Sequence, residues 1–321
     1  MPPVRVGVVG VGHMGRYHVG AYSEIPNVQI VSVCDAHPEP IRELAGQFGI
    51  EVHEDYRELF GKVDAVSVAV PTHLHYPVVK EFLEAGIHVL VEKPIASSLD
   101  EARDLFRIAA EKGKQLHIGH VERFNAAVLE LRNIVDEPYL IESRRIGPFN
   151  GRITDAGVVL DLLIHDLDIV INLVGKPISD MQVLGRCIVS DHEDLVTVQI
   201  RFEGGCVAHF LASRVTEHKS RTLAITQKGA YVLLDYTDQE IDIHRQASSS
   251  YRLTSSELKY RQESFIERIF VHKQNPLKLE LLHFLECALG LRERMTTIDG
   301  ELSSLIAATR VLEELRRLKA I

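Results

Sequence analysis

A lysine that closely follows a short apolar run is a candidate for a catalytic role in this sequence. Glu92, Lys93 and Pro94 follow residues 88–91, a run with the length and composition of a strand buried on both faces. Open α/β sheets bind their ligands at the carboxyl ends of the strands. We therefore expect Glu92 and Lys93 at a cofactor site, with Lys93 able to exchange a proton with a substrate. The alternative is a solvated ion pair on a surface loop.

A second apolar run, 65–70, is also followed by residues that could bind a ligand. Pro71, Thr72 and His75 come after it. Because parallel strands end at the same edge of a sheet, these residues should lie close to Lys93. We expect all three to contribute to the same cofactor site.

The long apolar segment 158–174 carries polar residues at helical spacing. Asp161 and His165 are four residues apart, and Asp168 follows three residues later, so they share one face of the predicted buried helix. Burying such groups is costly unless they are paired or face a polar cavity. The functional interpretation is that Asp161 and His165 face a bound cofactor and Lys93 across the cleft between two domains. The alternatives are an internally satisfied Asp–His pair, a helix end in solvent and a metal site.

Three glycines near the start of the chain have the spacing GxGxxG. They are Gly10, Gly12 and Gly15, with His13 and Met14 between the last two. Glycine at these positions allows a tight turn, close approach of the backbone to a pyrophosphate and close packing of the next helix, whose free N–H groups attract the anion. The motif has its required context, a predicted strand before it and a helix after it. These five residues predict a dinucleotide-binding turn.

An aspartate ends the second predicted strand, twenty residues after Gly15. In this position Asp35 would accept hydrogen bonds from the hydroxyl groups of an adenosine ribose and repel a 2′-phosphate. The next residues, Ala36 and His37, supply no arginine for such a phosphate. We therefore expect the cofactor to be NAD, with NADP less favoured.

The elements that must position these residues alternate between strand and helix over the first part of the chain. Runs typical of buried parallel strands lie at 4–9, 28–34, 65–70, 88–91 and 116–118. Helical spacing lies between them, and Ser98 with Glu101 forms a capping-box pair at one helix start. The fold class is therefore α/β, with a doubly wound parallel Rossmann sheet over residues 1–120.

The pattern changes after residue 120, where strands of period two are joined by tight turns. Two helices, about Leu277–Leu291 and Asp299–Leu318, are expected to end the chain. Residues 245–262 are polar and rich in serine, which predicts a loop or a mobile flap. Residues 121–321 should therefore form an α+β domain on a largely antiparallel open sheet.

The composition excludes several classes of protein. The chain has 321 residues, of which 45% are hydrophobic and 25% charged, and its net charge is −9. The length suits two domains, and the acidic balance argues against a nucleic-acid partner. No run reaches the ~20 apolar residues of a membrane span, and the start lacks a signal peptide. The four cysteines form no CxxC pair, so we expect reduced thiols, no metal site and a cytoplasmic location.

Together these motifs resemble the glucose–fructose oxidoreductase / inositol dehydrogenase / MocA-like (Gfo/Idh/MocA) family of NAD(P)-dependent oxidoreductases. The resemblance extends along the whole chain. It rests on the glycine turn 10–15, Pro71-Thr72, Glu92-Lys93-Pro94 and Gly157 with Asp161 and His165. It implies a Rossmann domain, a second domain whose open sheet forms the interface of a homodimer or homotetramer, and hydride transfer between a sugar or cyclitol hydroxyl carbon and nicotinamide. The sequence departs from the usual pattern at Asp155-Ala156-Gly157, where many members carry consecutive glycines, and at Leu163.

A finer resemblance points to the UDP-N-acetylglucosamine 3-dehydrogenase branch of this family. It rests on the segments around Arg123, Asn125, Arg144 and Arg152, and implies that these four residues bind substrate. Guanidinium groups bind phosphate oxygens in pairs, which suits a nucleotide diphosphate. The alternative is that these arginines only cover the surface of an acidic protein. If Arg144 and Arg145 lie on a strand they point to opposite faces, so only one could reach the site.

The expected function is an NAD-dependent dehydrogenase that oxidises the 3-hydroxyl of a UDP-N-acetylhexosamine. Lys93 or His165 would remove the hydroxyl proton, and Asp161 would orient one of them or a substrate hydroxyl. A myo-inositol or free-sugar dehydrogenase using the same residues is one alternative. A non-catalytic NAD-binding sensor is the other.

Overall fold

The computed structural model describes residues 2–151, 156–253 and 258–318. The chain divides into two compact units. The first unit comprises Met1–Phe124 and Gln274–Leu305, and the second comprises Asn125–Lys273 and Ile306–Ile321. Each unit has its own sheet and its own apolar core.

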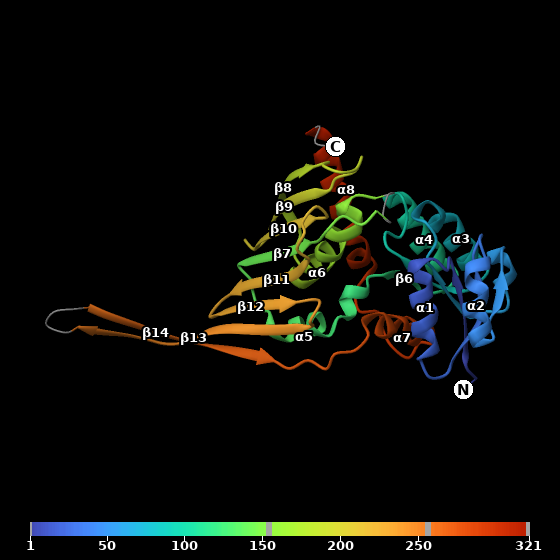
Figure 1. Cartoon of the computed structure of the whole chain (residues 1–321), viewed down its shortest axis with the longest axis horizontal. Helices are drawn as coiled ribbons and strands as arrows, with labels where there is room; N and C mark the ends of the chain where they lie inside the picture. Colours follow the sequence, from blue (N-terminus) through green and yellow to red (C-terminus); the bar gives the residue numbers. More distant parts are fainter. Residues whose placement is uncertain (1, 152–155, 254–257, 319–321) are drawn as a thin grey trace. The chain divides into compact units, whose positions relative to one another are not determined.

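The first unit contains a six-stranded sheet with the order β3-β2-β1-β4-β5-β6 (Figure 1). The strands are β1 (Val4–Val9), β2 (Val28–Cys34), β3 (Glu51–His53), β4 (Ala65–Val68), β5 (His88–Glu92) and β6 (Leu116–Gly119). Neighbouring strands pair in parallel throughout. This confirms the predicted Rossmann sheet. Its strand order reverses direction between β1 and β4, which is where such sheets bind their ligands.

Helices cover this sheet with their apolar faces. They are α1 (His13–Ser23), α2 (Glu39–Phe48), α3 (His75–Glu84), α4 (Leu99–Glu111) and α7 (Pro276–Ala288), with short 3₁₀ helices η1 (Tyr56–Leu59), η2 (Thr72–Leu74) and η3 (Val121–Phe124). The predicted capping box is present, because the Ser98 hydroxyl accepts from the Glu101 N–H and the Glu101 carboxylate accepts from the Ser98 N–H. Among the described helices, none is both long and apolar enough to cross a membrane.

The segment Gln274–Leu305 lies in the first unit, whereas the sequence predicts it in a continuous domain 121–321. The physical reason is the apolar face of α7. Leu281 and Phe284 on this face are fully buried in the same cluster as Val8 and Tyr22. Apolar burial of this size outweighs proximity along the chain. The division between the units then falls within α8 (Ile298–Arg317), after Leu305.

The second unit contains an eight-stranded sheet with the order β14-β13-β12-β11-β7-β10-β9-β8. The strands are β7 (Leu140–Ile146), β8 (Ile178–Arg186), β9 (Leu195–Phe202), β10 (Val207–Ser213), β11 (Ser220–Gln227), β12 (Ala230–Asp235), β13 (Glu240–Leu253) and β14 (Leu258–Ile269). β10 pairs with β7 in parallel, and the other pairings are antiparallel. The predicted, largely antiparallel sheet is therefore confirmed.

Helices pack on one face of this second sheet. α5 (Ala126–Ile134), the π-helix η4 (Val159–Leu163), α6 (Ile164–Val174) and the end of α8 share a core with alternate residues of the strands. The intervening strand residues, such as Gln199 and Arg201 on β9, are exposed. The expected assembly of a homodimer or homotetramer through this open face stays a prediction.

Strands occupy most of residues 245–262, which the sequence predicts as a loop or flap. β13 and β14 pair with each other from Ile241↔Ile269 to Leu253↔Leu258. β12 pairs with β13 only as far as Arg245, so the hairpin continues beyond the sheet as a two-stranded ribbon (Figure 1). The polar composition misled the prediction, because strands pair through backbone hydrogen bonds, which do not require an apolar residue at every second position.

The packing of α7 predicts a specific cost for shortening one buried side chain. Leu281→Ala should lower the free energy of unfolding by about 2–5 kcal/mol, because a fully buried leucine leaves a cavity. Leu289→Ala, at an exposed leucine just after the same helix, should change it by less than about 0.5 kcal/mol. Urea unfolding followed by circular dichroism measures both. Equal midpoints for the two variants would show that α7 is not packed as described.

Candidate active site

The glycine turn after β1 has no room for larger side chains. Gly10 has φ +83°, and a Cβ there would lie 2.7 Å from the backbone of Ala69. A Cβ on Gly15 would overlap the carbonyl group of Gly10. By contrast, nothing described lies within 4 Å of a Cβ placed on Gly12, which is exposed. Gly10 and Gly15 therefore shape the turn, and Gly12 keeps its outer surface open.

The N-terminus of α1 is suited to an anion. Gly12 is its N-cap, no side chain of the described residues caps it, and its first turn carries no acidic residue. His13 and Met14 begin the helix, so their N–H groups have no intrahelical acceptor. Free N–H groups and the positive end of the helix dipole bind phosphate. The turn therefore fits the pyrophosphate of a dinucleotide.

Asp35 lies just after β2 and is anchored by backbone N–H groups. Its Oδ2 accepts from Val11 at 2.7 Å, and its Oδ1 accepts from His37 at 2.9 Å. These bonds fix the carboxylate beside the glycine turn while leaving lone pairs for ribose hydroxyl groups. The position matches the one predicted for a cofactor ribose.

His75 is buried, and its ring connects the ends of β4 and β5. Nδ1 lies 2.8 Å from the carbonyl oxygen of Pro94, and Nε2 lies 2.8 Å from that of Val70. Burial lowers the pKa of His75, against the opposite effect of these two carbonyl groups. Backbone carbonyl groups occupy both nitrogens, so His75 holds the two strand ends together. The predicted contact between His75 and a cofactor stays a prediction.

Glu92 is also bound within the framework of the first unit, and its predicted contact with a cofactor stays a prediction. It is 9% exposed, and its Oε1 lies 2.9 Å from Nε2 of the fully buried His18 on α1. Burial has the largest single effect and would raise the pKa of Glu92, but the hydrogen bond and charge of His18, together with the charge and backbone N–H of Lys93, lower the pKa overall. Glu92 therefore fixes the end of β5 to α1. The next residue, Lys93, is half-buried, as is Thr72, and Pro71 is exposed, so all three remain within reach of a ligand.

In the second unit, Asp161 lies on a π-helical turn instead of the regular helix predicted over 158–174. η4 carries Asp161, and α6 carries His165; both side chains are half-buried. π-turns inserted in helices are frequent at functional sites. Asp168 is buried and accepts a hydrogen bond from Nδ2 of Asn172 at 3.3 Å, so it belongs to the core.

Glu193 holds the start of this π-turn. Its carbonyl oxygen accepts from the Val158 N–H at 2.9 Å, and its Oε1 accepts from the Val159 N–H at 3.1 Å. A Cβ on Gly157 would overlap the Glu193 carboxylate. Glycine at 157 is therefore required for this contact. This gives a physical reason why a glycine stands at the third position of Asp155-Ala156-Gly157.

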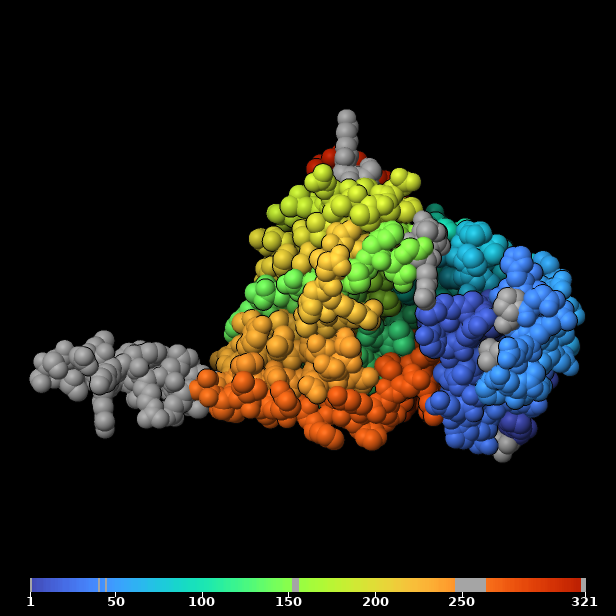
Figure 2. Space-filling view, in the orientation of Figure 1, coloured from blue at the N-terminus to red at the C-terminus, as the bar shows by residue number. Residues whose placement is uncertain are grey.

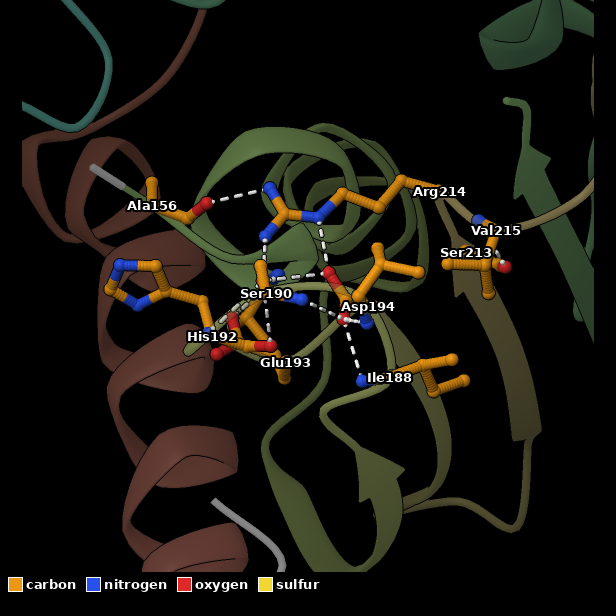
Figure 3. A network of polar contacts seen from close by, with 11 residues as sticks. Ala156, Ile188, Ser190, His192, Glu193, Asp194, Ser213, Arg214 and Val215 are labelled. Atoms are coloured by element: carbon orange, nitrogen blue, oxygen red, sulfur yellow. Dashed lines mark hydrogen bonds and ion pairs between the residues drawn. The ribbon is translucent and has the colours of Figure 1, made fainter. Parts of the chain in front are cut away.

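The neighbouring Asp194 forms a buried network with Arg214 (Figure 3). Nε of Arg214 lies 2.7 Å from Oδ1 of Asp194, and the other guanidinium nitrogens donate to Ser190 Oγ and the Ala156 carbonyl group. Burial would raise the pKa of Asp194, but the N–H groups of Ile188 and Val189 and the Arg214 guanidinium hold it well below its usual range. Arg214 thereby connects the end of β10 to the segment that leads into η4.

A cavity of about 450 Å³ in the second unit is bordered by Asp161 and by four basic residues. The basic residues are Arg145, Arg214, Lys219 and Arg221. The segments 147–151 and 213–216 are joined by hydrogen bonds on its rim and lie next to each other on the surface in Figure 2. Such a volume is typical of small-molecule sites. The sequence analysis missed Arg214, Lys219 and Arg221, although these three cations lie within eight residues of each other in the sequence.

Of the predicted substrate residues, Arg123, Asn125 and Arg144 are not among those that line this cavity. Arg123 is buried and lies 2.8 Å from Glu301 in the first unit. Asn125 caps α5 through its Oδ1, and its Nδ2 donates to the Tyr236 carbonyl oxygen at 2.9 Å. Arg144 is exposed on the sheet face opposite to that of Arg145, which pairs with Asp166 of α6. Arg152 lies outside the described residues.

Comparison with protein families gives two adjoining matches. Residues 4–120 match the oxidoreductase family with an NAD-binding Rossmann fold, and residues 117–232 match the GFO/IDH/MocA C-terminal domain. Together they cover the first predicted domain and the second as far as residue 232.

Individual relatives include dehydrogenases of nucleotide sugars and cyclitols. UDP-N-acetylglucosamine 3-dehydrogenase of Acidithiobacillus ferrooxidans is 34% identical over 77% of this chain and 79% of its own. Its solved structure matches with a TM-score of 0.85 over 97% of both chains. The scyllo-inositol 2-dehydrogenase (NAD(+)) of Bacillus subtilis is 25% identical over 94% of this chain and 91% of its own.

The network around Asp194 predicts both a cost of substitution and its pH dependence. Asp194→Asn should lower the free energy of unfolding by about 3–5 kcal/mol at neutral pH, because it leaves Arg214 buried without its counter-ion. The pKa of Asp194 is lower in the folded state, so its stabilisation is present above the unfolded value of about 3.9 and is lost as the pH falls through the folded value. The difference in free energy of unfolding between the wild type and Asp194→Asn should therefore become smaller in acid.

Urea unfolding between neutral and acidic pH measures this difference. Asp180→Asn, at an exposed aspartate on β8, is the matched control and should follow the wild type at every pH. A gap between Asp194→Asn and the wild type that stays constant into strong acid would contradict the ionic role of Asp194.

Proposed function

This chain belongs to the Gfo/Idh/MocA family of oxidoreductases, and on that premise we propose that it oxidises the 3-hydroxyl of UDP-N-acetylglucosamine with NAD as hydride acceptor. The observation that carries the choice of substrate is the cavity beside Asp161, whose lining includes Lys219 and Arg221 in addition to two arginines that pair with buried carboxylates. A free sugar or inositol has no charge to match them, whereas a nucleotide diphosphate does. The 34% identical relative that carries this name supports the same choice.

The first unit supplies the proposed cofactor site. The N–H groups of the turn Gly10, Gly12, His13, Met14 and Gly15 hold the pyrophosphate, and the anchored carboxylate of Asp35 accepts from the adenosine ribose. Pro71 and Thr72 at the end of β4 and Lys93 at the end of β5 lie on the side of the sheet where the nicotinamide is expected. When bound, NAD accepts the hydride from the sugar carbon.

The chain's own residues handle the proton of the oxidised hydroxyl group. We assign its removal to Lys93 or His165, both of which are half-buried and titratable. Asp161 accepts a hydrogen bond from a substrate hydroxyl or orients the group that takes the proton. Glu92, His18 and His75 act indirectly, because they fix the backbone on either side of Lys93.

Cofactor choice tests the role assigned to Asp35. The wild type should bind NAD more tightly than NADP, because the carboxylate repels a 2′-phosphate. Asp35→Asn keeps an acceptor for the Val11 N–H but removes the negative charge. It should lower the ratio of NAD affinity to NADP affinity by about tenfold or more. Fluorescence titrations with NADH and NADPH measure the ratio. Tighter binding of NADPH than of NADH by the wild type would reject the assignment.

The reaction itself is tested by NADH formation with UDP-N-acetylglucosamine, UDP-N-acetylglucosaminuronate, free N-acetylglucosamine and myo-inositol. We expect turnover of the UDP-N-acetylated sugar. Lys93→Met should lower kcat by about 10²–10⁴ while leaving NADH binding intact, and His165→Asn should also lower kcat strongly. Lys112→Met, at an exposed lysine after α4, should leave kcat unchanged.

Three outcomes would overturn these assignments. Turnover of myo-inositol with none of either nucleotide sugar would replace the proposed substrate by a cyclitol. Full activity of Lys93→Met would remove this lysine from the reaction. Binding of NADH without turnover of any of the four compounds would favour the sensor.

A further inference from the structure

We infer that Lys219 and Arg221, at the start of β11, bind the diphosphate of the nucleotide sugar, and that the two other basic residues of the cavity hold its walls in place. This inference rests on the proposed function and assigns its substrate site to particular residues. It departs from the sequence-based assignment to Arg123, Arg144 and Arg152.

Arg145 and Arg214 already have buried counter-ions. Nε and Nη2 of Arg145 lie 3.0 and 2.8 Å from the two carboxylate oxygens of Asp166, and both side chains are at most 2% exposed. Each of the three guanidinium nitrogens of Arg214 donates a hydrogen bond, to Asp194, Ser190 or the Ala156 carbonyl group. A guanidinium that is neutralised and hydrogen-bonded in this way has little capacity left for a charged ligand. These two arginines therefore act as wall-forming residues.

Lys219 differs from both of them. Its side chain is exposed, and within the described part of the chain its ammonium group has neither an ion pair nor a hydrogen bond. A lysine ammonium is a compact point charge with three donors, which suits phosphate oxygens. Lys219 can therefore bind an anion in the cavity without breaking an existing contact.

Arg221 on β11 lies next to Arg145 on the adjacent strand β7. The two residues are direct partners in the register of β11 and β7, so their side chains are on the same face. Arg221 lines the cavity and is half-buried, so its guanidinium is within reach of a ligand there. A diphosphate would accept paired hydrogen bonds from this guanidinium.

The other residues that line the cavity predict how the nucleotide sugar is oriented in it. Asp161 repels phosphate but accepts hydrogen bonds from sugar hydroxyl groups, so the sugar is expected beside η4 and the diphosphate beside β11. The ring of Phe149, which the Arg214 guanidinium covers at 5.3 Å, adds an apolar wall. The cavity thus has the lining expected for a molecule with an uncharged polar end and a dianionic middle.

The direct test is the binding of UDP to the NADH-loaded protein, measured by isothermal titration calorimetry in the wild type and in three variants. Lys219→Gln and Arg221→Gln should each weaken UDP binding on the order of 10- to 100-fold, the worth of one or two charge-assisted hydrogen bonds. Lys228→Gln is the matched control, because this exposed lysine lies at the opposite end of the same strand. Its affinity for UDP should equal that of the wild type.

Kinetics with UDP-N-acetylglucosamine add a second readout. Lys219→Gln and Arg221→Gln should raise KM by a similar factor with a smaller effect on kcat, since the diphosphate is remote from the reacting carbon. Inorganic pyrophosphate and UMP serve as further ligands: pyrophosphate should compete with UDP, and UMP should bind more weakly than UDP. Arg221→Lys separates charge from the paired geometry, and should recover only part of the affinity.

The outcomes separate this inference from the proposed function. Equal UDP affinity in the wild type, Lys219→Gln and Arg221→Gln, or an absence of UDP binding to the wild type, overturns the inference. Turnover of UDP-N-acetylglucosamine with unchanged KM in both variants overturns it as well, but leaves the proposed function standing. Loss of UDP affinity in the variants together with no turnover in the wild type supports a nucleotide site and rejects the proposed reaction.

Discussion

The buried ion pair between Arg214 and Asp194 is the interaction on which the geometry of the second unit's site depends. Asp194 accepts from three consecutive N–H groups, those of Ile188, Val189 and Ser190, in addition to Arg214. These contacts compensate for taking a carboxylate and a guanidinium out of water, a transfer that is otherwise costly. They fix the chain at residues 188–194. Glu193 is thereby held where its backbone and side chain meet the first N–H groups of η4.

The same principle separates structural charges from functional ones in both units. Glu92, Asp166 and Asp194 are buried and paired, and each joins two elements of its own unit. Lys93, Asp161 and Lys219 are half-buried or exposed at the ends of such elements. A buried pair is costly to break, which suits a framework, whereas a partly exposed charge can exchange water for a ligand. The chain as a whole has a net charge of −9, so a cavity lined by four basic residues differs from its overall acidic character.

The fold could be predicted from the sequence wherever a local pattern determines the structure. The glycine turn, the apolar strands 4–9 and 88–91 and the capping box at Ser98 are of this kind. The placement of α7 could not be predicted, because nothing local states which core a helix face joins. The ribbon of β13 and β14 was mistaken for a loop because its serine-rich sequence has no apolar period, although the backbones pair.

The residues of the candidate site were predictable to the extent that a motif names them. Lys93, Asp161 and Asp35 were named from their spacing, and their roles stay predictions. His75 and Glu92 were assigned to the cofactor from their polarity, which does not reveal that both are buried and hydrogen-bonded within the first unit. Arg123 and Arg144 illustrate the same limit, since one is neutralised by Glu301 and the other points away from α6. Lys219 and Arg221 could be assigned only once the strand register was known.

The central claim is that hydride leaves carbon 3 of a UDP-linked N-acetylglucosamine for NAD. It is tested most directly with substrate that carries deuterium at that carbon, by mass spectrometry of the NADH formed. The account predicts that the NADH carries the deuterium. Unlabelled NADH would show that the hydride comes from another position, and would contradict the account.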